Sequence, residues 1–196
     1  GSNIIILASQ KEVGEASAQR SFFRMSVYGL KYEDEQRIRE LGGDVQRTVP
    51  VRLMRKDGSL GDRRLELRVV GTLPGWFDLV PRRVIAGRVL NPQDVENNAA
   101  VCVLTESGAR RLLAGEHTVG ENIRIGNAFF EIIGVVESGQ SGSTLQAPDE
   151  EVDAYIPMNV GLQIFGEVTA RQTAGSRDIE WVQLHEILVD VRDTSR

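Results

Sequence analysis

The chain has 196 residues, of which 41% are hydrophobic, and it carries a formal net charge of −5. This length and apolar content suffice to bury the core of one large domain or two small ones, and they exclude a chain that is disordered throughout. The basic residues, 20 of which are Arg, are scattered, and the pI near 5.2 speaks against a nucleic-acid-binding protein.

Further limits come from the single cysteine, the apolar runs and the distribution of charge. Cys102 alone can form neither an intrachain disulfide nor a cysteine-based zinc cluster. The apolar run Ile4–Ala8 is far shorter than the roughly 20 residues that cross a bilayer, and Gly1-Ser2 is typical of a cloning remnant, so we expect a segment of a larger protein. There are 16 basic and 11 acidic residues through Arg88, against 7 and 17 from Val89 onward. Such asymmetry can steer a charged partner or reflect only solvated surfaces.

The first forty residues predict a strand, a loop and a helix. The β-branched run Asn3–Leu7 is typical of a strand, and the small, polar segment 8–20 is typical of a loop. Residues 21–30 are ambiguous. Acidic residues in the first turn and Gly42-Gly43 at the end predict a helix over Tyr32–Leu41.

Two alternating segments then predict an antiparallel ribbon. Val45–Arg55 alternates as a half-exposed strand, Lys56-Asp57-Gly58 is a turn signal, and Arg64–Gly71 returns with leucine and valine on one face. The charged face of this ribbon, with Arg52 and Arg68, is a candidate docking surface for another chain, although solvated charged faces are common.

The stretch from Val101 to Val136 gives the firmest structural signals. The continuous apolar run Val101–Leu104 predicts a strand buried on both faces. Thr105 or Ser107 can cap a helix over Ser107–Leu113 that ends at Gly115, with Leu112 and Leu113 toward the core and Arg110 and Arg111 outward. Beyond it, strands over Asn122–Ile125 and Ala128–Val136 form a hairpin, because Gly126-Asn127 tolerates the positive φ of a two-residue turn.

The polar segment 137–153 contains residue types found in catalytic and metal sites, but not in a matching pattern. Gly139–Ser143 lacks the last glycine of the G-x-S-x-G nucleophile elbow, and neither His117 nor His185 is spaced to serve it. The acidic residues lack the alternation and central glycine of a calcium loop, which leaves a solvated loop as the simpler interpretation. They are Asp149, Glu150, Glu151 and Asp153.

The C-terminal part predicts a short strand, a helix, a loop and a long strand. Ala154–Pro157 is the short strand, and Asn159 can cap a helix over Val160–Phe165 that Gly166 closes. Residues 167–178 are expected to form a polar loop, and Glu180–Val191 the last strand.

Six short sequence signals, in this order, carry a family resemblance. They are AGRVL, the loop residue Asp94, VCVL, ARRLL, VGENIRIG and FEIIGVV. Their order resembles the extracytoplasmic core domain of ABC-transporter permeases of the macrolide-exporter (MacB) type, a group related to the lipoprotein-releasing and FtsX-like permeases. The resemblance is strongest over residues 74–136 and extends weakly toward both ends.

The resemblance implies an α+β fold with two lobes. A mixed α/β lobe would comprise residues 3–75 and 178–196, and a β-rich lobe over 76–177 would be inserted into it. Trp76 and Phe77 would then lie at the crossing between the lobes. They are candidates for partner contact together with Arg52 and Arg68, with a core or lobe-junction role as the alternative.

The function that the resemblance implies is non-catalytic. The domain would pass movement driven by cytoplasmic ATP hydrolysis to an export pathway or a partner; an alternative is a module that binds an extracytoplasmic peptide or other ligand. No P-loop or cofactor fingerprint is present, so ATP would bind to a separate domain or subunit. Expected partners are the transmembrane helices of the same polypeptide, the ABC ATPase, a second permease copy and a periplasmic adaptor, at the bacterial inner membrane with this domain on the periplasmic side. An enzyme would require a catalytic constellation that the sequence does not display.

Overall fold

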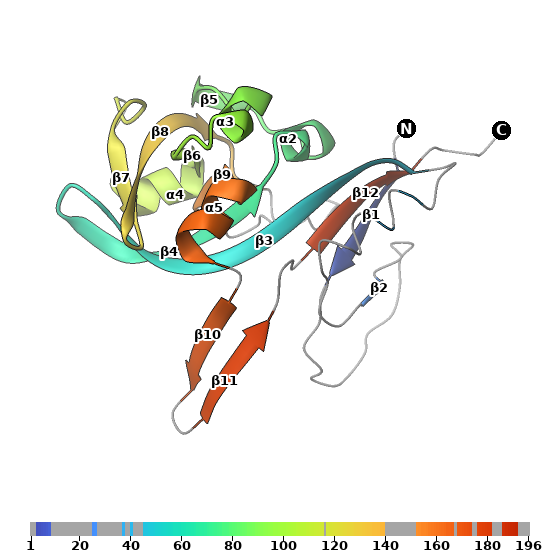
Figure 1. Cartoon of the computed structure of the whole chain (residues 1–196). Coiled ribbons are helices and arrows are strands. Elements are labelled where there is room, and N and C mark those ends of the chain that lie inside the picture. Colours follow the sequence, from blue (N-terminus) through green and yellow to red (C-terminus); the bar gives the residue numbers. More distant parts are fainter. Residues whose placement is uncertain are drawn as a thin grey trace. The chain divides into compact units, whose positions relative to one another are not determined.

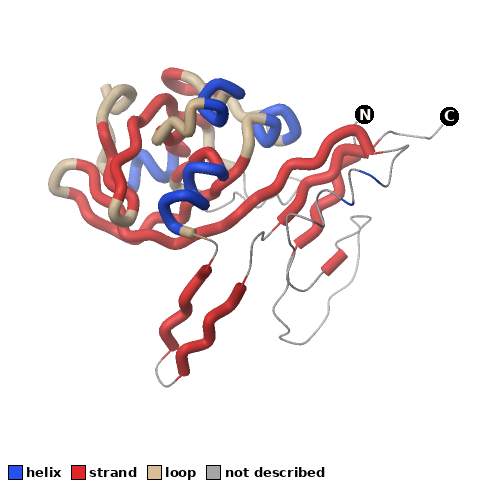
Figure 2. The backbone as a smooth tube through the Cα atoms, in the orientation of Figure 1, coloured by secondary structure: helices blue, strands red, loops and turns tan. Residues whose placement is uncertain are grey.

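The structure is a computed structural model that describes residues 3–8, 25–26, 37, 40, 45–115, 117–139, 152–166, 168–173, 176–181 and 186–191. Short helices accompany a larger number of strands in these residues (Figures 1 and 2), which confirms the predicted α+β class. Of the helix expected over Tyr32–Leu41, Arg37 and Glu40 are helical and exposed, and the rest lies outside the described residues.

The contacts divide the chain into two units. Unit 1 contains residues 1–52 and 165–196, and unit 2 contains residues 53–164. One stretch of chain is thus inserted into another, but the boundaries differ from the expected 75/76 and 177/178. Pro74–Phe77, the expected crossing, lies inside unit 2. The chain instead passes between the units at Arg52, within one uninterrupted strand, and after Ile164.

Unit 1 is built from strands that are far apart in the sequence. β1 (Asn3–Ala8) pairs antiparallel with β12 (Glu186–Val191) and parallel with β2 (Met25–Ser26). β12 also pairs antiparallel with the first half of β3 (Val45–Leu60). The first strand was predicted correctly over Asn3–Leu7.

The predictions of a loop over residues 167–178 and of one long strand over Glu180–Val191 were wrong. The structure has a separate two-stranded hairpin, β10 (Val168–Thr173) and β11 (Ser176–Trp181), and β12 follows as a strand of its own. Ladder hydrogen bonds make a strand of the polar 168–173 segment, whose composition by itself suggests a loop. His185 lies outside the described residues.

Unit 2 is a sheet with short helices beside it (Figure 2). Its strand order is β3, β4 (Arg63–Thr72), β9 (Ala154–Pro157), β6 (Val101–Thr105), β8 (Ala128–Val136) and β5 (Val84–Gly87), and β7 (Asn122–Ile125) joins β8 to β3. β9 runs parallel to β4 and β6 runs parallel to β8. The helices are α2 (Gly75–Leu79), α3 (Pro92–Glu96), α4 (Glu106–Arg111) and α5 (Met158–Phe165).

The turn between β3 and β4 lies later than predicted, at Gly61-Asp62 instead of Lys56-Asp57-Gly58. Gly58 lies within β3 and pairs with Ile125 of β7. A Cβ at Gly58 would approach the Leu67 side chain to 2.2 Å, so the missing side chain makes room for a core leucine. This glycine therefore serves packing within a strand, and the sequence pattern alone does not distinguish that role from a turn.

The hairpin and the central strand were predicted correctly. β7 and β8 have the expected bounds, with Ile125 opposite Ala128 and Gly126 at φ 60°. All five residues of β6 are buried, because β6 lies between β8 and β9. This strand forms the centre of the unit 2 core.

Helix α4 begins as predicted but ends differently. The Thr105 hydroxyl accepts a hydrogen bond from the Gly108 amide at 2.9 Å, as an N-cap does. Leu112 is buried, whereas Leu113 is 76% exposed, which contradicts its expected place in the core. Leu113 has φ 54° and ends the helix in the left-handed conformation, with the Ala114 amide donating to the Ala109 carbonyl. The helix thus ends before Gly115.

Replacing Leu113 by glycine is expected to stabilise unit 2. The left-handed conformation costs a non-glycine residue about 1 kcal/mol, and the exposed side chain buries little apolar surface. We expect Leu113→Gly to raise the free energy of unfolding by about 0.5–1 kcal/mol, measured by urea denaturation. Leu112→Gly, at a buried position, should lower it. A destabilised Leu113→Gly variant would show that the leucine side chain makes a contact that outweighs the backbone strain.

Helix α5 also begins differently from the prediction. Asn159 lies inside the helix instead of at its N-cap. Its side-chain amide donates to the Val95 carbonyl at 3.0 Å and to the Asn98 side-chain oxygen at 2.8 Å, which links α5 to the end of α3. Asn159 and its partners are more than 60 residues apart, so no local sequence pattern indicates the contact. Locally, Asn159 is a polar residue before an apolar run, which is the pattern of an N-cap.

Candidate functional site

The aromatic pair predicted as a contact candidate lies in the core of unit 2. Trp76 and Phe77 belong to α2, and both side chains are buried. Their rings pack on Tyr155 of β9 with centroid distances of 4.8 and 5.2 Å, and on each other at 5.3 Å. A buried ring offers no surface to a partner, so the arrangement corresponds to the core alternative that the sequence left open.

The two predicted arginines are not equivalent. Arg52 is buried in β3, at the position where the chain passes between the units. Arg68 in β4 is half-buried, and its backbone amide donates to the Asp153 carboxylate at 2.8 Å. The charged face expected around both residues is therefore buried at Arg52 and partly covered at Arg68.

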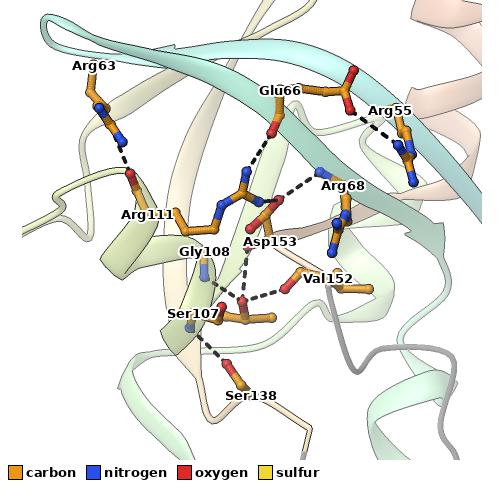
Figure 3. Close-up of polar contacts among 11 residues, drawn as sticks. Arg55, Arg63, Glu66, Arg68, Ser107, Gly108, Arg111, Ser138, Val152 and Asp153 are labelled. Carbon is orange, nitrogen blue, oxygen red and sulfur yellow. Dashed lines mark hydrogen bonds and ion pairs between the residues drawn. The ribbon is translucent and has the colours of Figure 1, made fainter.

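A polar network around Asp153 ties three elements of unit 2 together (Figure 3). Asp153 precedes β9, and its carboxylate, 2% exposed, accepts a charge-assisted hydrogen bond from the Arg111 guanidinium of α4. Arg111 also donates to the Glu66 carbonyl at 3.1 Å, and Arg63 donates to the Arg111 carbonyl at 3.1 Å. The network holds the C-terminal end of α4 against β4.

The backbone on the other side of Asp153 is held equally closely. The Asp153 carbonyl accepts from the Thr105 amide at 3.0 Å, and the Asp153 amide donates to the Arg68 carbonyl at 2.9 Å. Thr105 Oγ1 donates to the Val152 carbonyl at 2.6 Å while it caps α4. A Cβ at Gly108 would meet the Asp153 carbonyl at 2.2 Å, so only glycine fits there. The ion pair between Arg111 and Asp153 was not predicted, because the two residues are 42 positions apart and no local sequence pattern indicates the contact.

A second ion pair involves two residues of the quoted family signals. Arg88, which follows β5, binds the Asp94 carboxylate of α3 through both terminal nitrogens, at 2.7 and 2.9 Å. The Asp94 carboxylate also accepts from the Asn91 amide at 2.9 Å, and the Asn91 side chain accepts from the Asp94 amide at 3.0 Å, forming a capping box. Asp94 was expected in a loop but lies in the first turn of α3, and this contact joins it to the AGRVL signal.

This contact shifts the titration of both groups. The hydrogen bond from Arg88, with that from the Asn91 amide, lowers the pKa of Asp94 from its ordinary value despite burial. The hydrogen bond to Asp94 raises the pKa of Arg88. Because the folded pKa of Asp94 is lowered, its stabilising contribution is present above the unfolded pKa and is lost as the pH falls through the folded pKa.

The Asp94 pair is expected to appear in the pH dependence of stability. The free energy of unfolding of the wild-type chain should fall between about pH 5 and pH 2 by more than that of Asp94→Asn, because the variant has no carboxylate to protonate there. Arg88→Gln should flatten the same part of the profile, since it removes the partner. Urea denaturation across this pH range measures both. Parallel profiles for the wild type and the two variants would contradict the assignment.

The backbone beside Arg88 approaches β8 too closely for any side chain. A Cβ at Gly134 would lie 2.0 Å from the Arg88 carbonyl oxygen, and one at Gly87 would lie 2.1 Å from the Ile133 carbonyl oxygen. The Arg88 amide donates to that Ile133 carbonyl at 3.0 Å. The close approach keeps Arg88 within reach of Asp94.

Gly134→Ala is therefore expected to separate β5 from β8. We expect a loss of about 2–3 kcal/mol in the free energy of unfolding, the upper part of the range for an overpacked interior because the clash is with backbone, together with faster amide exchange at Arg88. Gly115→Ala is the matched control, because nothing lies within 4 Å of its Cβ position. Equal stability of the two variants would contradict the close approach.

A shallow, open depression of about 490 Å³ lies beside this contact. Its lining combines apolar side chains with the charged residues Arg88 and Glu131: Gly87, Arg88, Val101, Val119, Gly120, Glu131 and Ile133. The Gly120 amide donates to the Ile132 carbonyl at 2.7 Å, which fixes the 119–121 loop at its rim.

The residue types associated with catalysis do not gather in the described part of the chain. Cys102 is fully buried, and burial raises the pKa of its thiol, so the thiolate is disfavoured. His117 is exposed, and Gln140–Ser143 and Asp149–Glu151 lie outside the described residues. Among residues the structure describes, no cluster of three His, Cys, Asp or Glu side chains could hold a metal, and no helix has the length and apolarity to span a membrane.

Comparison with known sequences gives one consistent family. The family model described as the MacB-like periplasmic core domain matches residues 2–196. Macrolide export ATP-binding/permease protein MacB of Marinobacter nauticus is 30% identical over 113 residues, which cover 57% of this chain and 17% of that protein. The protein of the same name from Syntrophobacter fumaroxidans is 28% identical over 137 residues, covering 69% of this chain and 19% of that protein. The chain therefore spans about a fifth of the length of these relatives.

Comparison with solved structures supports the same fold. The periplasmic region of MacB from Actinobacillus actinomycetemcomitans has a TM-score of 0.66 at 19% identity, covering 98% of this chain and 76% of that one. The extracellular domain of the noncanonic ABC-type transporter YknZ from Gram-positive bacteria has a TM-score of 0.65 at 16% identity, covering 98% and 85%. The family match over nearly the whole chain confirms the resemblance seen in the sequence, and the chain belongs to the MacB-like periplasmic core domains of ABC-transporter permeases.

Proposed function

We propose that this domain couples ATP hydrolysis in the cytoplasm to export by changing its conformation or position on the periplasmic side of the bacterial inner membrane. The observation that carries the proposal is the family match over residues 2–196, together with relatives named ATP-binding/permease proteins in which the matched part is about a fifth of the length. In such a protein ATP would bind elsewhere, and this domain would receive movement through the transmembrane helices of its own polypeptide.

The organisation of the chain supports this role. Two compact units joined by two chain crossings can move as separate bodies, provided that more than one arrangement is close in free energy. Within unit 2, the Asp153 network and the Arg88–Asp94 pair connect α3, α4, β4, β5 and β9, so the unit would move as a whole. The other expected partners are a second permease copy and a periplasmic adaptor.

Spin-label distances in the parent transporter test the proposal. The substitutions Arg37→Cys, Asp62→Cys and Glu96→Cys place labels at exposed sites, the first in unit 1 and the other two in unit 2. The buried Cys102 will not take up label. We expect addition of ATP to change the distance between sites 37 and 62, or the distance between the two copies of site 62. The distance between sites 62 and 96 should stay constant, because both lie in one unit.

Label distances that do not change with nucleotide would reject coupling. If neither the distance between units nor the distance between copies differs among the nucleotide-free, ATP-bound and post-hydrolysis states, then the domain does not respond to the ATPase. A nucleotide-dependent change between sites 62 and 96 would instead place the movement inside unit 2.

A ligand-binding module is the second candidate, and the open depression beside Arg88 is the observation that favours it. Its mixture of Val101, Val119 and Ile133 with Arg88 and Glu131 would suit a ligand that has both apolar and charged groups. Titration of the isolated chain with candidate export substrates tests this alternative. Binding would be followed through the backbone amide signals of residues 119–121.

A further inference from the structure

Strand β5 is the end strand of the unit 2 sheet. Among the strands that the structure describes, it pairs with β8 alone, with Val84 opposite Val136 and Gly87 opposite Gly134. The backbone amides and carbonyls on its other side therefore have no strand partner in the described sheet. Such an edge is a template on which a further extended chain can pair.

The same edge exposes apolar side chains. Val84 is 42% exposed and Ile85 is 45% exposed, and both lie in the four-residue strand. Only three other large hydrophobic side chains are exposed among the described residues, and one of them, Val119, lines the depression at the end of β5. Exposed apolar side chains thus lie in the strand and in the depression that Gly87, its last residue, helps to line, and this depression could receive a side chain.

Positive charge flanks this apolar segment. Arg83 precedes β5 and Arg88 follows it. Arg88 is 47% exposed whereas its partner Asp94 is only 6% exposed, so a molecule approaching from solvent meets the guanidinium. Arg83 pairs with Glu137 at 2.8 Å, and the arginine is again the more exposed of the two. Glu131, which also lines the depression, and Glu121 beside its lining residue Gly120 are exposed carboxylates.

This charge pattern favours a strand of another protein over a second copy of β5 as the occupant of the edge. If a second copy of β5 paired antiparallel in register, Arg83 of each strand would lie opposite Arg88 of the other, and like charges directly opposite destabilise a strand pair. The register shift between Val84 and Ala86 further disturbs a symmetric pairing. A strand with acidic residues at both ends meets arginine at both ends instead.

We propose that β5 binds an extended, acid-flanked segment of a partner protein as an additional strand, with an apolar side chain of that segment in the depression beside Arg88. This docking surface deepens the proposed function, on which it rests, by giving unit 2 a place to hold the partner that it would move. Main-chain hydrogen bonds would supply the attachment, and the arginines would select for acidic flanks.

A peptide titration of the 196-residue chain tests the proposal. The probe is a short capped peptide of alternating valine and threonine with glutamate at each end, followed through the backbone amide signals. We expect saturable binding with Kd below about 1 mM, centred on the amides of residues 84–88. The same peptide N-methylated at alternate residues should bind at least about tenfold more weakly, because it lacks half of its donors, and lysine at the ends should weaken binding similarly.

Variants of the chain complete the test. Val84→Lys and Ile85→Lys should each weaken binding at least about tenfold, whereas Phe129→Lys, at the exposed end of the β7–β8 hairpin, should leave it unchanged. Equal binding of the N-methylated peptide, or signal changes centred away from β5, overturns the proposal. A dimer of the free chain that Val84→Lys abolishes would assign the edge to a second copy and overturns it too. None of these results bears on the label distances, so failure here and failure of coupling are distinguishable.

Discussion

Trp76→Ala is expected to lower the free energy of unfolding of unit 2 by about 3–5 kcal/mol, the range for removing a large aromatic side chain from a packed core. Trp76 is fully buried and contacts Phe77 and Tyr155, so its removal leaves a cavity among rings that belong to α2 and β9. The loss should appear as a lower urea midpoint for unit 2. Amide exchange at β6 and β9 measures it, because Trp181, the other tryptophan of the chain, lies in unit 1 and its fluorescence would report on that unit.

Phe129→Ala is the matched control for this result. Phe129 is also aromatic and lies in the same unit, but its side chain is 66% exposed. We expect its replacement to change the free energy of unfolding by less than about 0.5 kcal/mol. If Trp76→Ala lowered the free energy of unfolding as little as Phe129→Ala, the aromatic cluster would not be part of the core. Trp76 would then again be a candidate for partner contact.

Asp153→Ala is expected to cost about 3 kcal/mol. The substitution removes the carboxylate that binds Arg111 and the Arg68 amide, and it leaves that amide without its side-chain acceptor. The value lies at the lower end of the range for breaking a buried pair, because Arg111 is 41% exposed and its guanidinium can return to water. Urea denaturation measures the loss, and amide exchange at residues 106–113 should show α4 loosening.

Glu106→Ala provides the comparison for an exposed pair. Glu106 pairs with Arg110 one helical turn away at 3.3 Å on the surface of α4. Such pairs contribute about 0.3–0.5 kcal/mol, so its removal should be hardly measurable. A similar cost for Asp153→Ala and Glu106→Ala would mean that the buried network does not hold α4 to β4.

Features fixed by neighbouring residues could be predicted from the sequence. The β7–β8 hairpin depends on its turn, the Thr105 cap on a hydroxyl three residues before Gly108, and β6 on an unbroken apolar run. In each case the residues that specify the structure lie within a few positions of one another. Local chemistry then leaves few alternatives.

Features that depend on distant contacts could not be predicted. Gly58 resembles a turn residue until Leu67 and Ile125 are placed against it, and Asn159 resembles a cap until Val95 lies within reach. Leu113 continues an apolar pair, but the helix ends at that residue and turns its side chain outward.

The same limit applies to the candidate surfaces. Aromatic side chains are frequent at interfaces, which makes Trp76 a candidate, and the alternating pattern predicts an exposed charged face that contains Arg52, but both residues are buried. The edge position of β5 follows only from the complete strand order, so the sequence gives no reason to prefer Val84 and Ile85 over other apolar residues. The signals AGRVL and Asp94 carried only the family resemblance, and nothing in the sequence indicates that Arg88 binds Asp94.

The pairing of β1 with β12 has a consequence for the order in which the two units fold. Asn3 lies opposite Val191, so the pairing of β1 with β12 cannot form until residues 186–191 are available, whereas unit 2 is continuous over residues 53–164 and can fold earlier. Closing so long a loop is slow and entropically costly for an unstructured chain. Prior folding of the inserted unit shortens the effective loop, so β1 would gain its β12 partner only after unit 2 has folded.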